Sequence, residues 1–328
     1  MKLFFYQFRD YEELEFCEKY SKAYGIEYGT TPLYPSVETA DLCRGYDAVS
    51  VNPSDMSAPV LEKMHEAGVK YICGRSIGYD HIDLAAAKRL GMRVSNASYP
   101  PEAVANYAIT LMLMCLRKMK EIMARAAVQD FSLPGKIGRD ISFSTVGVIG
   151  TGKIGTTVLK HLSGFGCRLL CTDPYENDEA KKYAEYVDYD TLYRECDVIT
   201  LHTNATEENY HLLNEEAFSK MKDGVVIINT ARGSLIDTDA LISALESGKA
   251  GAAGLDVIEH EMGLYYNNKV SDVIANKDFA LLRTFPNVVL TPHTAFYTRA
   301  SIENMVKSAF DSALAFEKGE PTFHEVKL

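Results

Sequence analysis

The chain has 328 residues, enough for two ordinary domains, and 47% of them are hydrophobic, as in a globular protein with buried cores. Its formal net charge of −11 argues against nucleic acids and anionic membranes as partners, because both bind clustered Lys and Arg. Seven scattered cysteines without C-x-x-C spacing favour reduced thiols in a cytoplasmic protein over disulfides or a metal site.

The first hundred residues alternate strand-like and helix-like segments. Short apolar runs predict strands at residues 2–7, 48–51 and 70–73, and amphipathic stretches predict helices at residues 59–67 and 81–90. Such alternation predicts a parallel sheet with helices on its faces. This α/β unit has no phosphate-binding turn, so we expect it to cover a bound cofactor rather than to bind one.

A helix is expected over residues 102–127, directly after the break at Pro100 and Pro101. Its middle, ANYAITLMLMCLRKMK, is apolar nearly all the way round, and such a helix must be covered on more than one side. Burial of this helix between two domains of the chain would cover its apolar surface. Burial in a subunit interface as well is our preferred interpretation, and it predicts a homodimer. The apolar run is far below the ~18 residues of a membrane span, so none is expected.

Residues 145–173 carry the strongest ligand signal in the chain. A β-branched run at residues 145–149 predicts a buried strand, and G-x-G-x-x-G follows where a helix must begin. The first glycine permits a tight turn, the second lets backbone approach a pyrophosphate, and the third lets helix pack closely on strand. The helix N-terminus offers N–H groups to the phosphates. The predicted cofactor-binding residues of this turn are Gly150, Gly152, Lys153, Ile154 and Gly155.

Asp173 specifies which dinucleotide is expected. It ends a second predicted strand, residues 168–172, about 20 residues past the glycines, where a carboxylate holds the adenosine ribose hydroxyls. The same carboxylate repels a 2′-phosphate, and the residues that follow it, PYE, supply no arginine to bind one. The sequence therefore predicts NAD rather than NADP.

The rest of the predicted dinucleotide domain continues the alternation. Strands are expected at residues 198–202, 224–229, 252–257 and 287–291, with helices at residues 215–221 and 238–247. A parallel sheet of about six strands with its first βα turn at the cofactor is the doubly wound, or Rossmann, fold. One more amphipathic helix begins near residue 298, and its own sequence does not say which domain it joins.

Four polar residues near predicted strand ends are candidates for catalysis, because ligands of such sheets lie beyond the carboxyl ends of the strands. They are Arg232, Asp256, Glu261 and His293. Hydride transfer between NAD and a hydroxyl needs a proton donor and acceptor near neutral pH, which suits histidine. A neighbouring carboxylate such as Glu261 would favour the imidazolium. An arginine binds a substrate carboxylate with two hydrogen bonds.

Each candidate has an ordinary structural alternative. An arginine at a strand end is usually a solvated ion pair, and Asp256 could be a helix cap. His202 also lies at a predicted strand end, and His260 is adjacent to Glu261. Residue chemistry alone therefore ranks His293 only slightly ahead of these two histidines.

Six segments resemble the D-specific 2-hydroxyacid dehydrogenases. They are GRSIGYDHID, SNASYPPEAVANYA, GVIGTGKIG, INTARGSLIDTDAL, AAGLDVIEHE and PNVVLTPHTAFYT, in family order and spread over nearly the whole chain. The resemblance implies that Arg232, Glu261 and His293 form the catalytic set. Arg232 would bind the 2-oxoacid carboxylate, His293 would protonate the nascent alkoxide, and Glu261 would pair with His293.

The resemblance implies further site residues. Ile77 and Gly78 would bind the substrate carboxylate through backbone N–H groups, Tyr99 would line the pocket, and Arg232 and His293 complete the substrate site. Asp256 would lie near the nicotinamide. The implied cofactor contacts beyond the glycine turn and Asp173 are Thr203, Asn204, Thr230, Ala231, Arg232, Asp256 and His293.

The resemblance also implies how the two domains are assembled. Residues 1–100 with 298–328 would form a flavodoxin-like substrate-binding domain, and residues 101–297 the Rossmann domain, with the helix at 102–127 as the dimerisation helix. The final helix would thus return to the first domain. That domain would then close over the cofactor by a hinge and exclude water from the reacting carbonyl.

Two features select a branch of the family. A long segment, residues 263–285, separates Glu261 from PNVVL, and His293 is followed by TAFYT. Both resemble the D-lactate and D-2-hydroxyisocaproate enzymes, and SVN, RSIGYDHID and NASYPP resemble the D-lactate dehydrogenases of vancomycin-resistance clusters. The leading hypothesis is an NADH-dependent reduction of pyruvate to D-lactate. The alternatives are a reductase for branched or aromatic 2-oxoacids and an NAD-sensing binding protein like the family's corepressors.

Overall fold

The computed structural model describes residues 1–328. The chain forms two compact units, which we call unit 1 (residues 1–100 and 297–328) and unit 2 (residues 101–296). Each has one parallel sheet, of five strands in unit 1 and seven in unit 2, so the predicted class of two α/β units is confirmed.

Unit 1 has the strand order β2-β1-β3-β4-β5, which is the flavodoxin-like order. Its strands are β1 (Lys2–Phe5), β2 (Glu27–Thr30), β3 (Ala48–Val51), β4 (Tyr71–Gly74) and β5 (Arg93–Ser95). Its helices are α1 (Asp10–Tyr24), α2 (Ala58–Glu66), α3 (Leu84–Arg89) and α11 (Arg299–Glu317). Apolar side chains of β1, β3 and β4 pack against α2 and α3 on one face.

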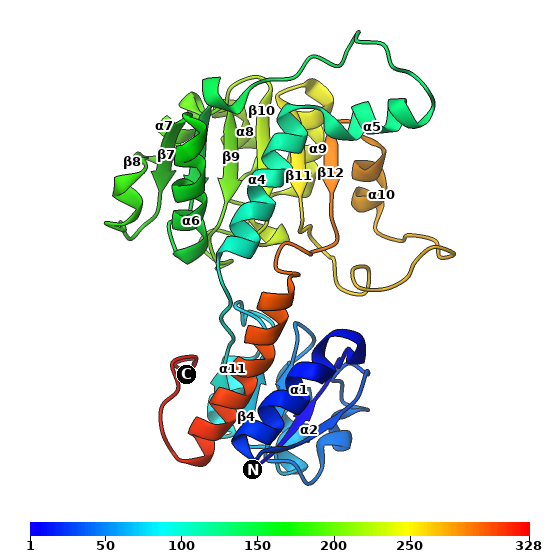
Figure 1. Ribbon diagram of the computed structural model, residues 1–328, viewed down its shortest axis with the longest axis vertical. Helices are drawn as coiled ribbons and strands as arrows, with labels where there is room; N and C mark the ends of the chain where they lie inside the picture. The colour runs from blue at the N-terminus through cyan, green and yellow to red at the C-terminus, as the bar shows by residue number, and fades with distance from the viewer. The chain divides into compact units, whose positions relative to one another are not determined.

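The final helix, α11, belongs to unit 1. It packs along α1 and against β4, and Figure 1 shows α1 and α11 side by side. The ring of Phe310 in α11 lies 5.6 Å from that of Phe5 in β1. The second face of the sheet is thus covered by two helices that are distant in sequence.

Unit 2 has the strand order β12-β11-β10-β9-β6-β7-β8, all parallel. The order reverses between β6 and β9, which are neighbours, as in doubly wound sheets. Its strands are β6 (Thr145–Ile149), β7 (Arg168–Thr172), β8 (Glu185–Tyr186), β9 (Val198–Leu201), β10 (Val225–Asn229), β11 (Ala250–Leu255) and β12 (Val288–Leu290).

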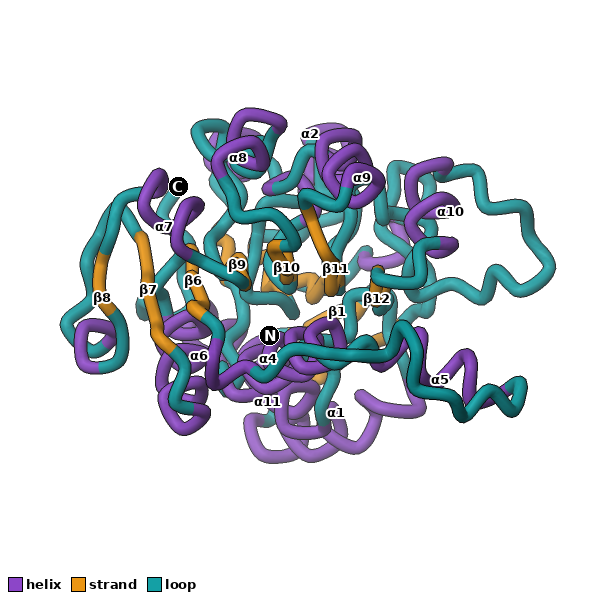
Figure 2. The backbone as a smooth tube through the Cα atoms, turned by 90° about the horizontal axis from the view of Figure 1, so that it is seen from above, coloured by secondary structure: helices purple, strands orange, loops and turns teal.

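Helices cover both faces of the unit 2 sheet, and Figure 2 shows α4 and α6 on one side of the strands and α8, α9 and α10 on the other. The helices are α4 (Glu102–Leu116), α5 (Met119–Ala127), α6 (Lys153–Leu162), α7 (Tyr189–Glu195), α8 (Glu215–Lys220), α9 (Thr238–Ser247) and α10 (Lys277–Thr284). The central strands are apolar on both faces: Val226 and Ile228 of β10 join the core under α4 and α6, and Ile227 joins the opposite core.

The single helix predicted over residues 102–127 is wrong, because the structure has two. The chain breaks at Lys118, whose φ of 52° is left-handed, and α5 then begins at Met119. The N–H of Arg139 caps the carbonyl of Leu116 at the end of α4 (2.9 Å). Helix α4 has several buried residues and packs against α6 and strands β10 to β12 of its own unit, whereas α5 has no buried residue.

No helix in the structure has both the length and the apolar character that crossing a bilayer requires.

Candidate active site

The glycine turn joins β6 to α6 with little room for side chains where backbone segments meet. Gly150 has a φ of +93°, and a Cβ there would lie 2.7 Å from the carbonyl of His202. A Cβ on Gly155 would lie 1.9 Å from the carbonyl oxygen of Gly150. A Cβ on Gly152, by contrast, would meet nothing within 4 Å. The first and third glycines therefore serve packing, and the second leaves backbone open to a ligand. This arrangement fits a dinucleotide pyrophosphate at the start of α6, next to Lys153 and Ile154.

Asp173 follows β7 and lies across the glycine turn. Its Oδ2 accepts the N–H of Thr151 (2.7 Å), and its Oδ1 accepts the N–H of Tyr175 (2.8 Å). These bonds place the carboxylate beside the turn, as a ribose-binding acid requires. Sequence reasoning missed two residues that hold Thr151: the Tyr186 hydroxyl lies 2.6 Å from its hydroxyl, and Asn177 Nδ2 donates to its carbonyl (2.9 Å).

The segments after β9 and β10 carry the other predicted cofactor contacts. Thr203 and Asn204 follow β9, and Thr230 and Ala231 follow β10. Since β6, β9 and β10 are consecutive in the sheet, these positions lie along the edge that also carries the glycine turn. The Thr230 hydroxyl is buried and has no hydrogen-bond partner in the protein, so a ligand at this edge could satisfy it.

His202, the rival acid–base candidate, does not fit that role. Its Nε2 lies 2.9 Å from the hydroxyl of the buried Thr200, and burial lowers its pKa to about 3. The imidazole therefore stays neutral near pH 7 and lies against the glycine turn. His260 is exposed and, at a φ of +57°, forms part of the turn that precedes Glu261.

The three catalytic candidates follow three adjacent strands. Asn229, Leu255 and Leu290 are register partners at the carboxyl ends of β10, β11 and β12. Arg232 comes three residues after β10, Glu261 six after β11, and His293 three after β12. The parallel sheet therefore delivers them to one edge, although 61 positions separate Arg232 from His293 (293 − 232).

Arg232 sits on a turn that Asn229 shapes. Asn229 is buried at the end of β10, its Oδ1 accepts the N–H of Ala231 (3.0 Å), and its Nδ2 donates to the carbonyl of Arg232 (2.8 Å). The next residue, Gly233, fits directly against the backbone of Ile258, because a Cβ there would lie 2.1 Å from that carbonyl carbon. Sequence reasoning did not single out Asn229, although it lies in the INTARG segment.

Asp256 anchors the loop that carries His293. It is fully buried, and it accepts hydrogen bonds from the Thr291 hydroxyl (2.6 Å) and from the N–H groups of Thr294 (2.9 Å) and Ala295 (2.8 Å). Its own carbonyl accepts the N–H of His293 (2.8 Å). Burial raises the pKa of this carboxyl, against the lowering effect of its hydrogen bonds. The structure thus uses Asp256 to shape the turn around His293.

His293 and Glu261 form a close pair. Nδ1 of His293 lies 2.6 Å from Oε1 of Glu261, and the two side chains are 21% and 26% exposed. Oε2 of Glu261 also accepts the N–H of Ile258 (3.2 Å). His293 has a φ of +53°, a strained conformation that its loop must hold in place. With Nδ1 on the carboxylate, Nε2 is the nitrogen that can serve a substrate.

The substrate-binding candidates Ile77 and Gly78 lie in unit 1, in the loop after β4. Tyr99 also lies in unit 1, next to Pro100, where residues 1–100 of this unit end. Asn96 Nδ2 donates to the carbonyl of Ile77 (2.8 Å), and the Ser76 hydroxyl donates to the carbonyl of Gly78 (2.7 Å). Both bonds occupy carbonyl groups of the loop.

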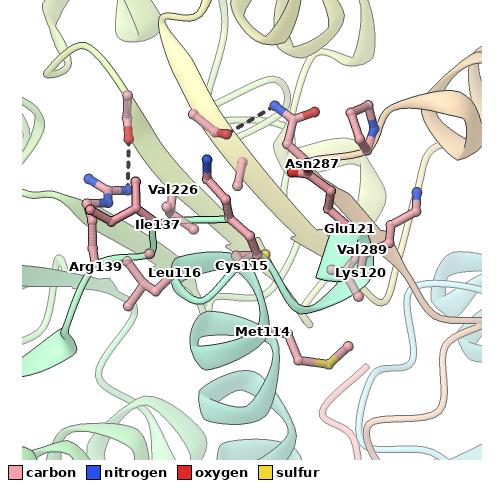
Figure 3. Close-up of a pocket in the computed structure, with 16 residues that line it drawn as sticks. Met114, Cys115, Leu116, Lys120, Glu121, Ile137, Arg139, Val226, Asn287 and Val289 are labelled. Carbon is pink, nitrogen blue, oxygen red and sulfur yellow. Dashed lines mark hydrogen bonds between the residues drawn. The ribbon is translucent and has the colours of Figure 1, made fainter. Parts of the chain in front are cut away.

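A cavity of about 490 Å³ lies in unit 2, remote from these residues. It lies where β10, β11 and β12 begin, and Figure 3 shows Leu116, Lys120 and Arg139 among its lining residues. Lys120 Nζ donates to the carbonyls of Phe285 and Val288 (both 2.7 Å), and Arg139 donates to that of Gly224 (2.9 Å). The side chains of Lys120 and Arg139 at this cavity therefore bind backbone carbonyls. Ligands of doubly wound sheets lie at the opposite edge, beyond the carboxyl ends of the strands.

Comparisons with known proteins agree with this geometry. The model of the family described as "D-isomer specific 2-hydroxyacid dehydrogenase, NAD binding domain" matches residues 109–295. The chain is 41% identical over 329 residues to a D-lactate dehydrogenase of Escherichia coli (strain K12), covering 99% of this chain and 100% of that one. It is 40% identical over 320 residues to an aromatic 2-oxoacid reductase of Clostridium sporogenes, covering 97% and 96%.

The fold agrees as well. A solved structure of D-2-hydroxyisocaproate dehydrogenase matches with a TM-score of 0.88 at 35% identity and covers 99% of both chains. The relatives and the solved structure match over nearly the full length of the chain, and the family model matches residues 109–295. The chain belongs to the D-isomer specific 2-hydroxyacid dehydrogenase family and is an NAD-dependent oxidoreductase.

Proposed function

We propose that this enzyme reduces a small 2-oxoacid to the D-2-hydroxyacid with NADH, and that pyruvate, giving D-lactate, is its main substrate. The observation that carries the proposal is the contact of His293 with Glu261 at the edge of the sheet where Arg232 and the glycine turn also lie. The pair supplies a proton donor, and Arg232 supplies a cation for the substrate carboxylate.

The chemistry follows from these groups. Arg232 binds the carboxylate of the 2-oxoacid and polarises its carbonyl, and bound NADH supplies the hydride. As the carbonyl oxygen becomes an alkoxide, Nε2 of His293 donates its proton. Glu261 stabilises the imidazolium through Nδ1 and holds the ring in orientation. Oxidation of the hydroxyacid uses the same atoms, with neutral His293 accepting the hydroxyl proton.

Unit 1 has the substrate-binding role in this proposal. The N–H groups of Ile77 and Gly78 receive the substrate carboxylate, and Tyr99 lines the pocket. Closure of residues 1–100 and 298–328 over the Rossmann domain, residues 101–297, would exclude water and strengthen the electrostatic interactions at the carbonyl. Asp256 holds the loop that carries His293. The residues that line the cofactor are Thr203, Asn204, Thr230 and Ala231, and the buried Thr230 hydroxyl can bond to it.

Substitution of the acid–base residue tests the proposal. His293→Ala should lower kcat for pyruvate by about 10²- to 10⁴-fold, the usual contribution of general acid–base catalysis, while the Kd of NADH stays within about twofold of the native value. Arg232→Lys should lower kcat and raise KM for the 2-oxoacid, because an ammonium cannot make two parallel hydrogen bonds to a carboxylate. Retained turnover in His293→Ala would refute the assignment.

A bulkier substrate is the second candidate, and one feature of unit 2 favours it. The rings of Tyr266 and Phe296 lie 6.2 Å and 6.3 Å from the His293 ring, so an aromatic side chain on the substrate would find apolar partners near the imidazole. Comparison of kcat/KM for pyruvate, 2-oxoisocaproate and phenylpyruvate decides between them. Failure to oxidise NADH with all three would favour the NAD-sensing alternative.

We also propose that the protein is a homodimer. We propose the cytoplasm as its location, where the seven thiols stay reduced. The support for the homodimer is a run of exposed apolar side chains on α5 and after it, which we call the apolar arm. Figures 1 and 2 show α5 and the segment after it at the outside of unit 2. The arm comprises Met123, Val128, Phe131, Leu133 and Ile137. Exposed apolar patches of this kind mark interaction sites.

Light scattering after size-exclusion chromatography tests this interface. The double substitution Phe131→Asp with Leu133→Asp should give a monomer. Phe323→Asp, at an equally exposed phenylalanine of unit 1, should leave the dimer intact. A native protein that is monomeric at micromolar concentration would refute the dimer.

A further inference from the structure

A second histidine–carboxylate pair has its carboxylate, Glu259, on the same loop as Glu261, and the proposed chemistry does not use this pair. Nε2 of His211 lies 2.8 Å from Oε1 of Glu259. The other carboxylate oxygen of Glu259 accepts the hydroxyl of Thr238 (2.6 Å) and its N–H (3.2 Å). The Glu259 side chain is only 15% exposed, so both of its oxygens are bound by fixed donors with little access to water.

The segment from Ile258 to Glu261 is thereby held at two places. Glu259 and Glu261 flank His260, whose φ is +57°, and the two carboxylates bind different partners: Glu259 binds His211 and Thr238, and Glu261 binds His293. The backbone at the start of this segment, between Ile258 and Glu259, packs against Gly233, which follows Arg232. Loss of the Glu259 anchor would release the segment that aims Glu261 at the imidazole.

The partner of Glu259 is itself rigidly placed. His211 lies between β9 and α8, and its ring stacks on that of Tyr210 with centroids 3.9 Å apart. The backbone N–H of His211 donates to the carbonyl of Ser234 (2.9 Å). Its Nδ1 lies 3.5 Å from Asp237, whose side chain caps α9 through the N–H of Ala240. The pair thus ties the Glu261 loop to the first turn of α9 and to the segment after β9.

We propose that Glu259 and His211 are positioning residues for the reaction: together they fix the loop that holds Glu261 against His293. The inference rests on the proposed acid–base role of that pair. Neither residue touches the reacting atoms in this scheme. Their contribution is to keep Glu261 within hydrogen-bond distance of Nδ1, since a displacement of about 1 Å at a catalytic group can cost on the order of 10²-fold in rate.

Steady-state kinetics on the full-length enzyme tests the proposal, with pyruvate and NADH as substrates. Glu259→Ala should lower kcat by about 10- to 100-fold, while KM for pyruvate and the Kd of NADH each change by less than about twofold. Glu259→Gln retains an acceptor for Thr238 and a polar group facing His211, and it should recover most of the lost kcat. His211→Ala, at a more exposed side chain, should lower kcat in the same way and serves if Glu259→Ala does not fold.

Asp188→Ala is the matched control for lost stability. Asp188 caps α7 in the same unit by accepting the N–H of Thr191 (2.7 Å), so its loss should destabilise the fold and leave kcat of the folded enzyme native. The proposal is overturned if Glu259→Ala and His211→Ala behave like Asp188→Ala, with native kcat per folded molecule. Native turnover in His293→Ala would instead overturn the proposed acid–base function, and this inference with it.

Discussion

Because His202 is neutral in the folded protein, we expect the free energy of unfolding to depend on pH through this residue. Burial lowers the pKa of His202 to about 3 in the folded chain, whereas an unfolded chain has the ordinary value of about 6.5. Between these values only the unfolded state binds the proton. Stability from this group is therefore complete above about pH 6.5 and is lost as the pH falls toward 3.

The magnitude follows from the two pKa values. The free energy of unfolding should fall by about 1.4 kcal/mol for each pH unit in this window, so the loss from pH 7 to pH 5 is about 2 kcal/mol. His202→Gln removes the titrating ring and keeps a polar group that can reach the Thr200 hydroxyl, now 2.9 Å from Nε2. The variant should lack this part of the pH dependence, whatever its stability at pH 7.

Urea unfolding of the cofactor-free protein, followed by circular dichroism at pH 7 and pH 5, measures the effect. The other titrating groups are shared, so they cancel in the difference between the native protein and His202→Gln. That difference should shift by about 2 kcal/mol in favour of the variant on going to pH 5. A difference that stays constant within about 0.5 kcal/mol would show that His202 titrates alike in both states and refute the reasoning.

Three further substitutions test particular contacts. Asp173→Ala should raise the ratio of kcat/KM with NADPH to that with NADH by about tenfold or more, because a carboxylate that repels the 2′-phosphate is gone; an unchanged ratio contradicts the assignment. Gly155→Ala places a Cβ 1.9 Å from the carbonyl oxygen of Gly150, so it should cost about 1–3 kcal/mol of stability and weaken NADH binding in a fluorescence titration; native affinity would contradict the close packing. Glu13→Gln leaves the fully buried Arg75 without its carboxylate partner at 2.9 Å and should cost about 3–5 kcal/mol in urea unfolding, whereas a cost under about 1 kcal/mol would contradict a buried ion pair.

Local sequence signals predicted several elements of the fold closely. The strands predicted at residues 145–149 and 168–172 and the helix at 238–247 have the observed bounds. Their signals are local: β-branched or aliphatic runs form the strands, and Asp237 caps the helix that Gly248 stops with a φ of +79°. The glycine turn was predicted equally well, because its G-x-G-x-x-G spacing lies within six consecutive residues.

Elements that depend on distant contacts were predicted less well. The two-residue strand β8 has no periodic signal, although its Tyr186 holds the glycine turn through Thr151. Nothing in RKMK forbids a continuous helix, yet the chain breaks there at Lys118. Lys120, just beyond the break, donates to carbonyls of Phe285 and Val288, more than 160 positions away, and such contacts override helix propensity.

By itself, the sequence determined the fold class, the NAD-binding turn and the residue types at the strand ends, because strand periodicity, glycine chemistry and side-chain acidity are properties of short segments. Only the tertiary structure separated three histidines of one chain: His293 lies against Glu261, His202 is half-buried with a lowered pKa, and His211 binds Glu259. Burial and partner both depend on parallel strands that bring together residues far apart in the chain, and no local pattern encodes which carboxylate each imidazole will meet.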